Sequence, residues 1–202
     1  MSSNAGKNVM KRRTADQSRT FILRAASDVF AERGYEKSSI REVAKRAGIS
    51  IGGIYIYFRN KEDLYTGLIQ SQMHEFLGQV EALCAEMPLP AFRKLIDLYM
   101  ELAVTKTKML STSIKEYDLE FRRPLRDAFF RAQHRAITDM LRQGMQSGVL
   151  KPMDCSATAL MILVTLRGAI LGYLTGDIRD PKAYGRSLYE IILHGIRSRT
   201  NA

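Results

Sequence analysis

The sequence predicts an all-α protein. Helix-forming residues dominate its 202 positions, and long runs of the β-branched residues that favour strands are few. Five prolines and no tryptophan occur, and apolar residues recur at the spacing of amphipathic helices. Hydrophobic residues at 46% and charged residues at 26% are ordinary for a soluble globular chain. A chain of this length can hold one compact domain, or a small module beside a larger core.

The N-terminal region is expected to form a disordered arm followed by a helix. Residues 1–15 are small, polar and basic, which is typical of a segment that cannot build a packed core. Over residues 16–33, apolar residues repeat as adjacent pairs every four positions between Phe21 and Phe30. Gly34 is the expected end of this amphipathic helix.

The pattern of residues 39–58 predicts two short helices joined by a tight turn. The hydroxyl of Ser39 can cap the first helix, and Glu42 three residues later can complete a capping box. Gly48 follows this helix and can adopt the left-handed conformation that such a turn needs. Ser50 is placed to cap the second helix.

The second helix of this pair has an unusual outer face. Its inward residues are Ile54 and Phe58, which lie one helical turn apart. The outward positions are Ser50, Ile51, Gly52, Tyr55 and Tyr57. Exposed aromatic residues and glycines beside several cations are unusual for a merely solvated face and typical of a surface that touches DNA.

Downstream of this segment the pattern stays helical. Asn60 is placed to cap a fourth helix, and Glu62 and Asp63 fall in its first turn, where acidic residues suit the helix dipole. This helix is expected to end before Pro88. Further helices are expected over residues 90–109, 113–121, 124–144, 154–174 and 183–197. The expected domains are the basic arm (1–15), a three-helix helix-turn-helix domain (16–63) and a larger helical domain (64–202).

The net charge of +10 is concentrated in the N-terminal third. Residues 1–63 carry 13 Lys and Arg against 7 Asp and Glu, whereas the remaining 139 residues carry 18 against 14. A high pI alone would be explained by solubility. Its concentration beside the helix-turn-helix indicates an anionic partner. The basic arm could contact phosphates or a minor groove, or could simply hang free.

Several short motifs occur together between Arg19 and Leu68. They are FAERGY at 30–35, SIREVA at 39–44, AGIS at 47–50, YIYF at 55–58 and NKEDL at 60–64. In this combination the segment resembles the DNA-binding part of the tetracycline-repressor (TetR) family of bacterial regulators. The resemblance implies an all-helical homodimer, a palindromic operator on double-stranded DNA, and a C-terminal domain that binds a small-molecule effector and forms the dimer.

The resemblance also implies DNA contacts, residue by residue. Phosphate or groove contacts are implied for Ser39, Ser50, Tyr55, Tyr57 and Lys61. Arg41 has the reach and the paired donors to recognise a guanine in the major groove. Ile51, Gly52 and Gly53 stand where family members often carry polar or longer side chains. We therefore expect close backbone approach, apolar contact to a thymine methyl and dependence on DNA shape.

The candidate residues of the C-terminal domain follow less specific patterns. Tyr99, Tyr117, Phe121 and Met140 could line a ligand pocket or form ordinary core. Arg167 lies in an apolar helix and needs either a carboxylate, the favoured interpretation, or an anionic ligand. Its candidate carboxylate partners are Glu101, Glu116, Asp118 and Glu120. The residues expected at the dimer interface are Gly168, Gly172, Leu188, Ile192 and Ile196.

Motifs of common enzyme classes are missing from the sequence. There is no P-loop, no GxSxG and no HExxH, so no enzyme activity and no cofactor are expected. No metal site is expected either, because the three histidines are isolated: His74, His134 and His194. Cys84 and Cys155 stand far apart, which favours a reducing compartment. Arg167 within the apolar run 157–174 argues against a membrane span, and a cytoplasmic location is expected.

The resemblance, together with the long fourth helix, implies a transcriptional repressor that a small-molecule ligand releases from DNA. Without ligand, two reading helices of a dimer would occupy successive major grooves of a palindrome. The alternative is a DNA-binding activator or adaptor whose C-terminal domain binds a protein partner and no small molecule. Release from DNA by a ligand would distinguish the two.

Overall fold

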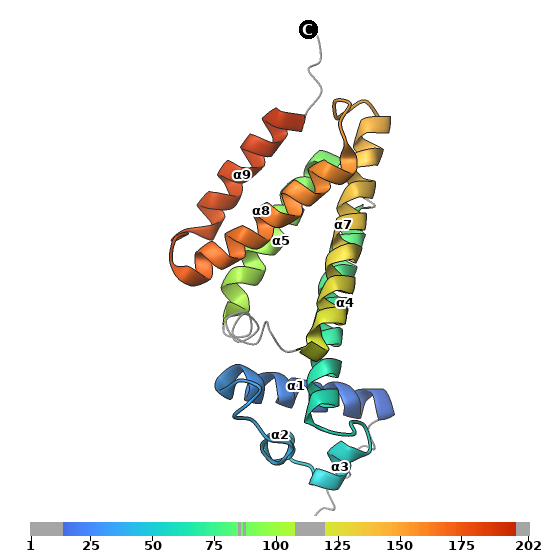
Figure 1. Ribbon diagram of the computed structural model, residues 1–202, viewed down its shortest axis with the longest axis vertical. Helices are drawn as coiled ribbons and strands as arrows, with labels where there is room; N and C mark the ends of the chain where they lie inside the picture. Colours follow the sequence, from blue (N-terminus) through green and yellow to red (C-terminus); the bar gives the residue numbers. More distant parts are fainter. Residues whose placement is uncertain (1–13, 85, 87, 108–119, 197–202) are drawn as a thin grey trace, which may run out of the picture. The chain divides into compact units, whose positions relative to one another are not determined.

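The structure is a computed structural model that describes residues 14–84, 86, 88–107 and 120–196. These residues form α-helices and one short 3-10 helix and contain no strand, which confirms the predicted all-α class. The elements in chain order are α1 (Ala15–Arg33), α2 (Ile40–Ala47), α3 (Ile51–Tyr55), α4 (Lys61–Cys84), α5 (Pro88–Thr105), η1 (Glu120–Arg122), α7 (Arg123–Gln146), α8 (Cys155–Thr175) and α9 (Pro181–Ile196) (Figure 1).

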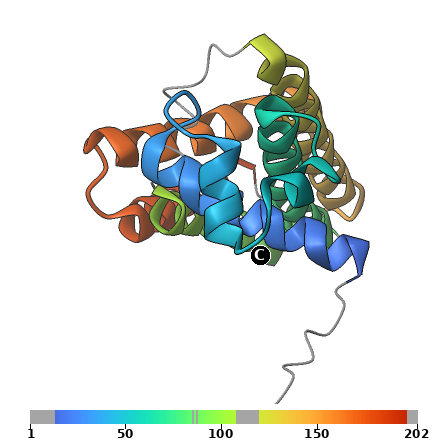
Figure 2. The ribbon, with the colours of Figure 1, turned by 90° about the horizontal axis from the view of Figure 1, so that it is seen from below.

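The chain divides into two compact units between Leu68 and Ile69, inside α4. The N-terminal unit contains the long α1, the short α2 and α3, and the first turns of α4, and α1 to α3 form one group in Figure 2. Its core consists of side chains that these four helices bury together, among them Ile22, Val43, Ile54 and Leu64.

The C-terminal unit is built around α5. This helix contacts α7, α8 and α9, and α7 packs along α8. Leu95, Ile96 and Tyr99 of α5 are fully buried in the core that these helices share. Phe76, from the second half of α4, packs edge-on against Tyr99 with ring centroids 5.1 Å apart. An aromatic pair therefore joins α4 to α5 at the centre of this unit.

Helix boundaries follow local capping groups, and several differ from the sequence prediction. Helix α1 begins at Ala15 because Thr14 and Gln17 form a capping box, so the predicted arm is one or two residues too long. Helix α9 begins at Pro181 rather than 183, with the Asp180 carboxylate accepting from the third residue of the helix. The helix predicted over 113–121 lies mostly outside the described residues.

Candidate nucleic-acid interface

Helix α2 is held at both ends by the groups that its sequence predicts. The Ser39 hydroxyl accepts from the Glu42 N–H at 3.3 Å, and the Glu42 carboxylate accepts from the Ser39 N–H at 2.9 Å. At the other end Gly48 has φ 63°, and its N–H donates to the carbonyls of Ala44 and Lys45. The capping box and the glycine turn are therefore both present.

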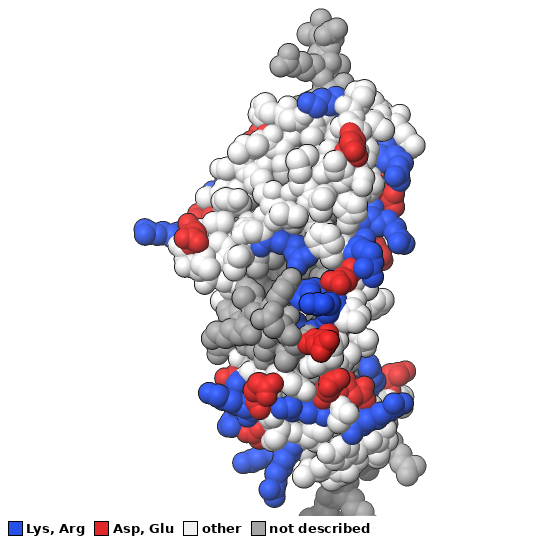
Figure 3. Space-filling model, viewed as in Figure 1, with Lys and Arg blue, Asp and Glu red and all other residues white. Residues whose placement is uncertain are grey.

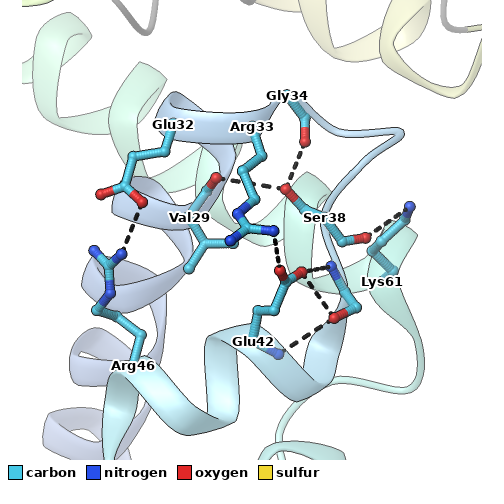
Figure 4. Close-up of polar contacts among 9 residues, drawn as sticks. Val29, Glu32, Arg33, Gly34, Ser38, Glu42, Arg46 and Lys61 are labelled. Atoms are coloured by element: carbon cyan, nitrogen blue, oxygen red, sulfur yellow. Dashed lines mark hydrogen bonds and ion pairs between the residues drawn. The ribbon is translucent and has the colours of Figure 1, made fainter.

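Ion pairs fix α2 against α1 (Figure 4). Arg33, the last residue of α1, lies 2.5 Å from the Glu42 carboxylate, and Arg46 donates to Glu32 at 2.8 Å. The hydrogen bond from the Ser39 hydroxyl holds the pKa of Glu42 below its ordinary value, and the charge of Arg33 acts in the same direction. The position of α2 is thus set by polar contacts as well as by its buried apolar face.

Arg41 lies on the exposed side of α2, away from this network. Within the described parts of the chain, no hydrogen bond or ion pair of its guanidinium is formed. Its five N–H groups therefore remain available to a base edge or a phosphate.

Helix α3 buries one side and exposes a mainly apolar opposite side. Ile54 and Phe58 are buried, at 0% and 2% exposure. Ile56 is 78% exposed, the highest value among the large apolar residues described. Two residues along a helix correspond to a rotation of about 200°. Ile56, the C-cap of α3 with helical backbone angles, lies two residues after Ile54 and therefore points away from the core, on the same ridge as Gly52.

Ile56 was not among the residues predicted from the sequence to touch DNA. The helical period alone places it opposite the buried pair and could have found it. Its neighbours Ile51 and Tyr55 are also exposed, at 41% and 52%, while Tyr57 is half-buried. The outer face of α3 is therefore an apolar and aromatic surface, which we call the reading surface, comprising Ile51, Gly52, Tyr55 and Ile56.

Two serines cap the helices at the reading surface, and their hydroxyls differ. Ser39 donates its hydroxyl hydrogen to the Glu42 carboxylate at 2.9 Å. Ser50 accepts from the Gly53 N–H at 3.0 Å, and its own hydrogen has no acceptor among the described residues. Only Ser50 therefore keeps a hydroxyl donor for a phosphate.

The two glycines of α3 leave room for another molecule. A Cβ added at Gly52 would meet only the Ser50 Oγ, at 3.9 Å, and at Gly53 the nearest atom is the same oxygen at 3.4 Å. The protein itself therefore does not require glycine at position 52. A ligand that approaches the backbone closely would require glycine at this position.

The side chain of Lys61, predicted as a phosphate contact, forms hydrogen bonds within the chain. Its Nζ donates to the carbonyls of Tyr35 at 3.0 Å and Ser38 at 3.2 Å, and it lies 4.3 Å from the centre of the Tyr35 ring (Figure 4). These acceptors occupy its donors, so in this structure Lys61 fixes the turn before α2. A phosphate contact by its side chain would have to break these bonds.

Charged side chains crowd the surface of α1 to α3. Figure 3 shows Lys and Arg over this unit, with Asp and Glu between them. Several of the acids are already engaged, since Asp28 and Glu32 face Arg46 and Glu42 faces Arg33. Arg41 stays unpaired on the exposed side of α2 in the described structure.

Comparison with known proteins identifies this arrangement. Residues 22–68 match the sequence profile described as bacterial regulatory proteins, tetR family. The chain belongs to the TetR family. The matched segment runs from the buried side of α1 to the second turn of α4 and includes the capped α2, the turn and the reading surface. The TetR chain is therefore a DNA-binding transcriptional regulator.

Curated TetR relatives span nearly the whole chain. The fatty acid metabolism regulator protein of Bacillus subtilis (strain 168) is 27% identical over 185 residues, which cover 88% of this chain and 95% of the relative. The HTH-type transcriptional regulator TtgR of Pseudomonas putida is 28% identical over 179 residues, 82% of this chain and 85% of that one.

Solved TetR structures share the fold of both units. FadR from Bacillus subtilis in complex with stearoyl-CoA superposes with a TM-score of 0.72 at 25% identity and covers 88% of this chain and 99% of that chain. The SmeT–triclosan complex has a TM-score of 0.77 at 21% identity, covering 90% and 92%, and shows similarity of fold alone.

The C-terminal unit brings two of the predicted ligand residues, Tyr99 and Arg167, together. The buried Tyr99 hydroxyl donates to Gln133 of α7. The positive charge of Arg167, on α8, acts to lower the pKa of this phenol, against the larger effect of burial. Met140 is buried in the core, and Phe121 is half-buried in η1. Tyr117 lies outside the described residues.

The predicted partners of Arg167 do not pair with it in the described structure. Its guanidinium lies over the Phe130 ring, 5.0 Å from the centroid. Glu101 and Glu120 are exposed and form no ion pair with it. The other two candidates, at positions 116 and 118, lie outside the described residues. The favoured interpretation of an ion pair is thus not supported by any described carboxylate.

The predicted dimer residues divide between two faces. Leu188, Ile192 and Ile196 of α9 pack against the core of their own unit. Gly172 packs on the same chain too, because an added Cβ would lie 3.0 Å from Ile178. Gly168 is exposed, and an added Cβ would meet no atom within 4 Å. The apolar side chains exposed on these helices are Leu160, Met161, Val164, Leu171, Tyr184 and Ile191.

Helix α8 is apolar enough, by length and composition, to cross a membrane, with a mean hydropathy of 1.8. The structure explains this apolar composition without a membrane. Leu163 and Leu166 face the core, whereas Met161 and Val164 are 62% and 55% exposed on the other side. Apolar residues therefore occupy both faces of a helix that belongs to a packed unit. No cluster of three potential metal ligands occurs in the described part of the chain.

Proposed function

We propose that this TetR-family chain is a homodimeric cytoplasmic repressor that binds a near-palindromic operator and leaves it when a small molecule binds. It has no catalytic activity and needs no cofactor. The observation that carries the proposal is the capped α2–α3 pair, which exposes an unpaired Arg41 on α2 and the reading surface on α3. A surface of this kind has no role inside the folded chain.

Arg41 and the reading surface would recognise DNA by different means. Arg41 supplies paired donors for a guanine, and Ile51 and Ile56 supply apolar contact to thymine methyl groups. Ser50 keeps a donor for a phosphate, which positions the helix without reading sequence. Because direct hydrogen bonds to bases are few, DNA shape contributes a large share of the specificity.

The exposed apolar face of α8 and α9 would form the dimer. Val164 and Leu171 lie on one side of α8, with Gly168 between them, and Ile191 of α9 is 71% exposed. Burial of such a face between two copies removes apolar surface from water and allows helices to approach closely at the glycine. A dimer also places two reading surfaces on half-sites, which a single module needs for useful affinity.

Binding of a small molecule is supported by two similar structures. One similar structure holds stearoyl-CoA and another holds triclosan. A ligand that binds one dimer shape better than another changes operator affinity by the same factor, typically about 5–150-fold. The C-terminal unit of this chain would hold such a ligand.

The test is selection of bound sequences from random duplex DNA by the purified protein at two salt concentrations. We expect an enriched near-palindrome whose affinity falls steeply as salt rises. Addition of ligand to this probe then distinguishes a ligand-released repressor from a protein-binding activator or adaptor. Binding that depends on salt but enriches no sequence would contradict the proposal.

A further inference from the structure

We propose that the effector is an acyl amphiphile whose acidic group is bound by Arg167. The inference rests on the proposed function, because it concerns the ligand of that regulator. Three observations carry it: a half-buried cation without a described counterion, a neutral polar pair beside it, and partly buried apolar residues one turn away.

Arg167 is a cation in an apolar environment that no described carboxylate neutralises. It projects from α8, a core helix, and is half-buried. Its contact in the described chain is the face of the Phe130 ring at 5.0 Å. A ring face interacts with the guanidinium plane and leaves the N–H groups at its edge without acceptors. Those donors are planar and paired, which suits a carboxylate or a phosphate.

The phenol of Tyr99, on which the charge of Arg167 acts, cannot serve as its counterion. Burial raises the pKa of Tyr99 far above its ordinary value, and the charge of Arg167 only opposes this shift. The phenol is therefore neutral at physiological pH and donates its hydrogen to the Gln133 carbonyl oxygen. Gln133 in turn donates to the Phe129 carbonyl at 3.3 Å, so the pair is satisfied without Arg167. The positive charge at the junction of α5, α7 and α8 remains uncompensated by described groups.

Apolar residues continue from this junction along two of the helices. Leu102 lies one turn beyond Tyr99 on α5, and Ile170 lies one turn beyond Arg167 on α8. Both are only partly buried and pack against the core, as Phe130 does. A cation beside incompletely buried apolar side chains fits a molecule with an acidic end and an aliphatic chain. The acidic end can be a carboxylate or the phosphates of a thioester carrier, because both present oxygens to a guanidinium.

The experiment measures binding of three probes to the full-length protein by calorimetry. Stearate carries a carboxylate, stearoyl-CoA carries phosphates, and stearyl alcohol has the same chain without a charge. We expect at least one acidic probe to bind the wild type at least tenfold more tightly than the alcohol. Arg167→Gln removes this preference and leaves alcohol binding unchanged, whereas Arg167→Lys retains part of it. The exposed Arg142, paired with Asp139, provides the control Arg142→Gln, which binds like the wild type.

Some outcomes overturn the inference and leave the proposed function intact. Equal binding of acids and alcohol by the wild type overturns it, as does failure of both acids to bind, or an acid preference that survives in Arg167→Gln. Thermal melting shows whether Arg167→Gln folds. If that variant does not fold, the partial preference for acids expected of Arg167→Lys still tests the inference. Release of the selected operator by some neutral compound would support the proposed function while this inference fails.

Discussion

Replacement of Gly52 by alanine should stabilise the free protein and weaken its binding to DNA. The added Cβ would meet only the Ser50 Oγ, at 3.9 Å, which is an ordinary contact distance. Glycine inside a helix costs about 0.5–1 kcal/mol relative to alanine. Because Gly52 lies in the first turn of α3, we expect a gain of about 0.5 kcal/mol in the free energy of unfolding.

The effect on DNA binding has the opposite sign. Gly52 shares the outermost ridge of α3 with Ile56, so a methyl group there projects toward the bases and holds the backbone away from them. We expect operator affinity to fall at least tenfold, which corresponds to about 1.4 kcal/mol. Fluorescence anisotropy with the selected operator at fixed salt measures this loss, and urea unfolding measures the stability.

A second glycine provides the matched control. Gly78 lies in α4, far along the chain from the reading surface, and an added Cβ would meet no atom within 4 Å. Gly78→Ala should stabilise by a similar or larger amount and leave operator affinity unchanged. If Gly52→Ala binds the operator as tightly as the wild type, close backbone approach is refuted. If Gly52→Ala destabilises the protein, the inference that a Cβ fits at position 52 is wrong.

Three further variants test the ion pair, the dimer face and the anchoring lysine. The folded-state pKa of Glu42 is lowered, so its stabilisation is present above the ordinary carboxyl pKa of 4.5 and is lost as pH falls through the lowered value. Glu42→Gln should therefore flatten the acid side of the stability–pH curve measured by thermal melting. Ile191→Glu places a charge on the exposed face of α9 and should give a monomer by light scattering that still folds. Lys61→Met should lower the stability of the N-terminal unit but leave the slope of log affinity against log salt unchanged, whereas loss of a phosphate contact would reduce it by about 1.

Each of these has an outcome that contradicts its reasoning. An unchanged acid side in Glu42→Gln would mean that the Ser39 and Arg33 contacts do not act on this carboxylate in solution. A dimer that persists in Ile191→Glu would place the interface elsewhere. A reduced salt slope in Lys61→Met would return Lys61 to the predicted phosphate contact. A charge-reversing change at the exposed Glu190 provides a control for Ile191→Glu.

The helix-turn-helix could be predicted almost residue by residue because its determinants are local. The Ser39 box, the Gly48 turn, the Ser50 cap and the Asn60 cap each depend on groups within four residues, and all are present. The capping box at Thr14 follows the same rule and was overlooked. Ile56 could also have been found from the helical period, without any structure.

The remaining features depend on contacts that sequence spacing does not encode. Lys61 bonds to a turn more than twenty residues earlier, so nothing near it in the sequence indicates its acceptors. Helix α8 is apolar on both faces, so periodicity cannot show which face meets the core. For α9 the apolar stripe Leu188, Ile192 and Ile196 is predicted at a dimer interface, and the structure shows that these side chains also contact the core of their own unit.

The anchoring of Lys61 determines how a change in α4 reaches the operator surface. Its Nζ donates to the Ser38 carbonyl, one residue before the Ser39 cap of α2. Rotation of the first turn of α4 must therefore move the segment before α2 together with Lys61, or break the hydrogen bonds of Lys61. Each hydrogen bond from a charged donor costs roughly 1.5–3 kcal/mol to break. Typical coupling energies of about 1–3 kcal/mol are too small to break them all. In the proposed repressor, the effector's influence would therefore arrive as a displacement of an intact α2, with its caps closed, and not as local melting.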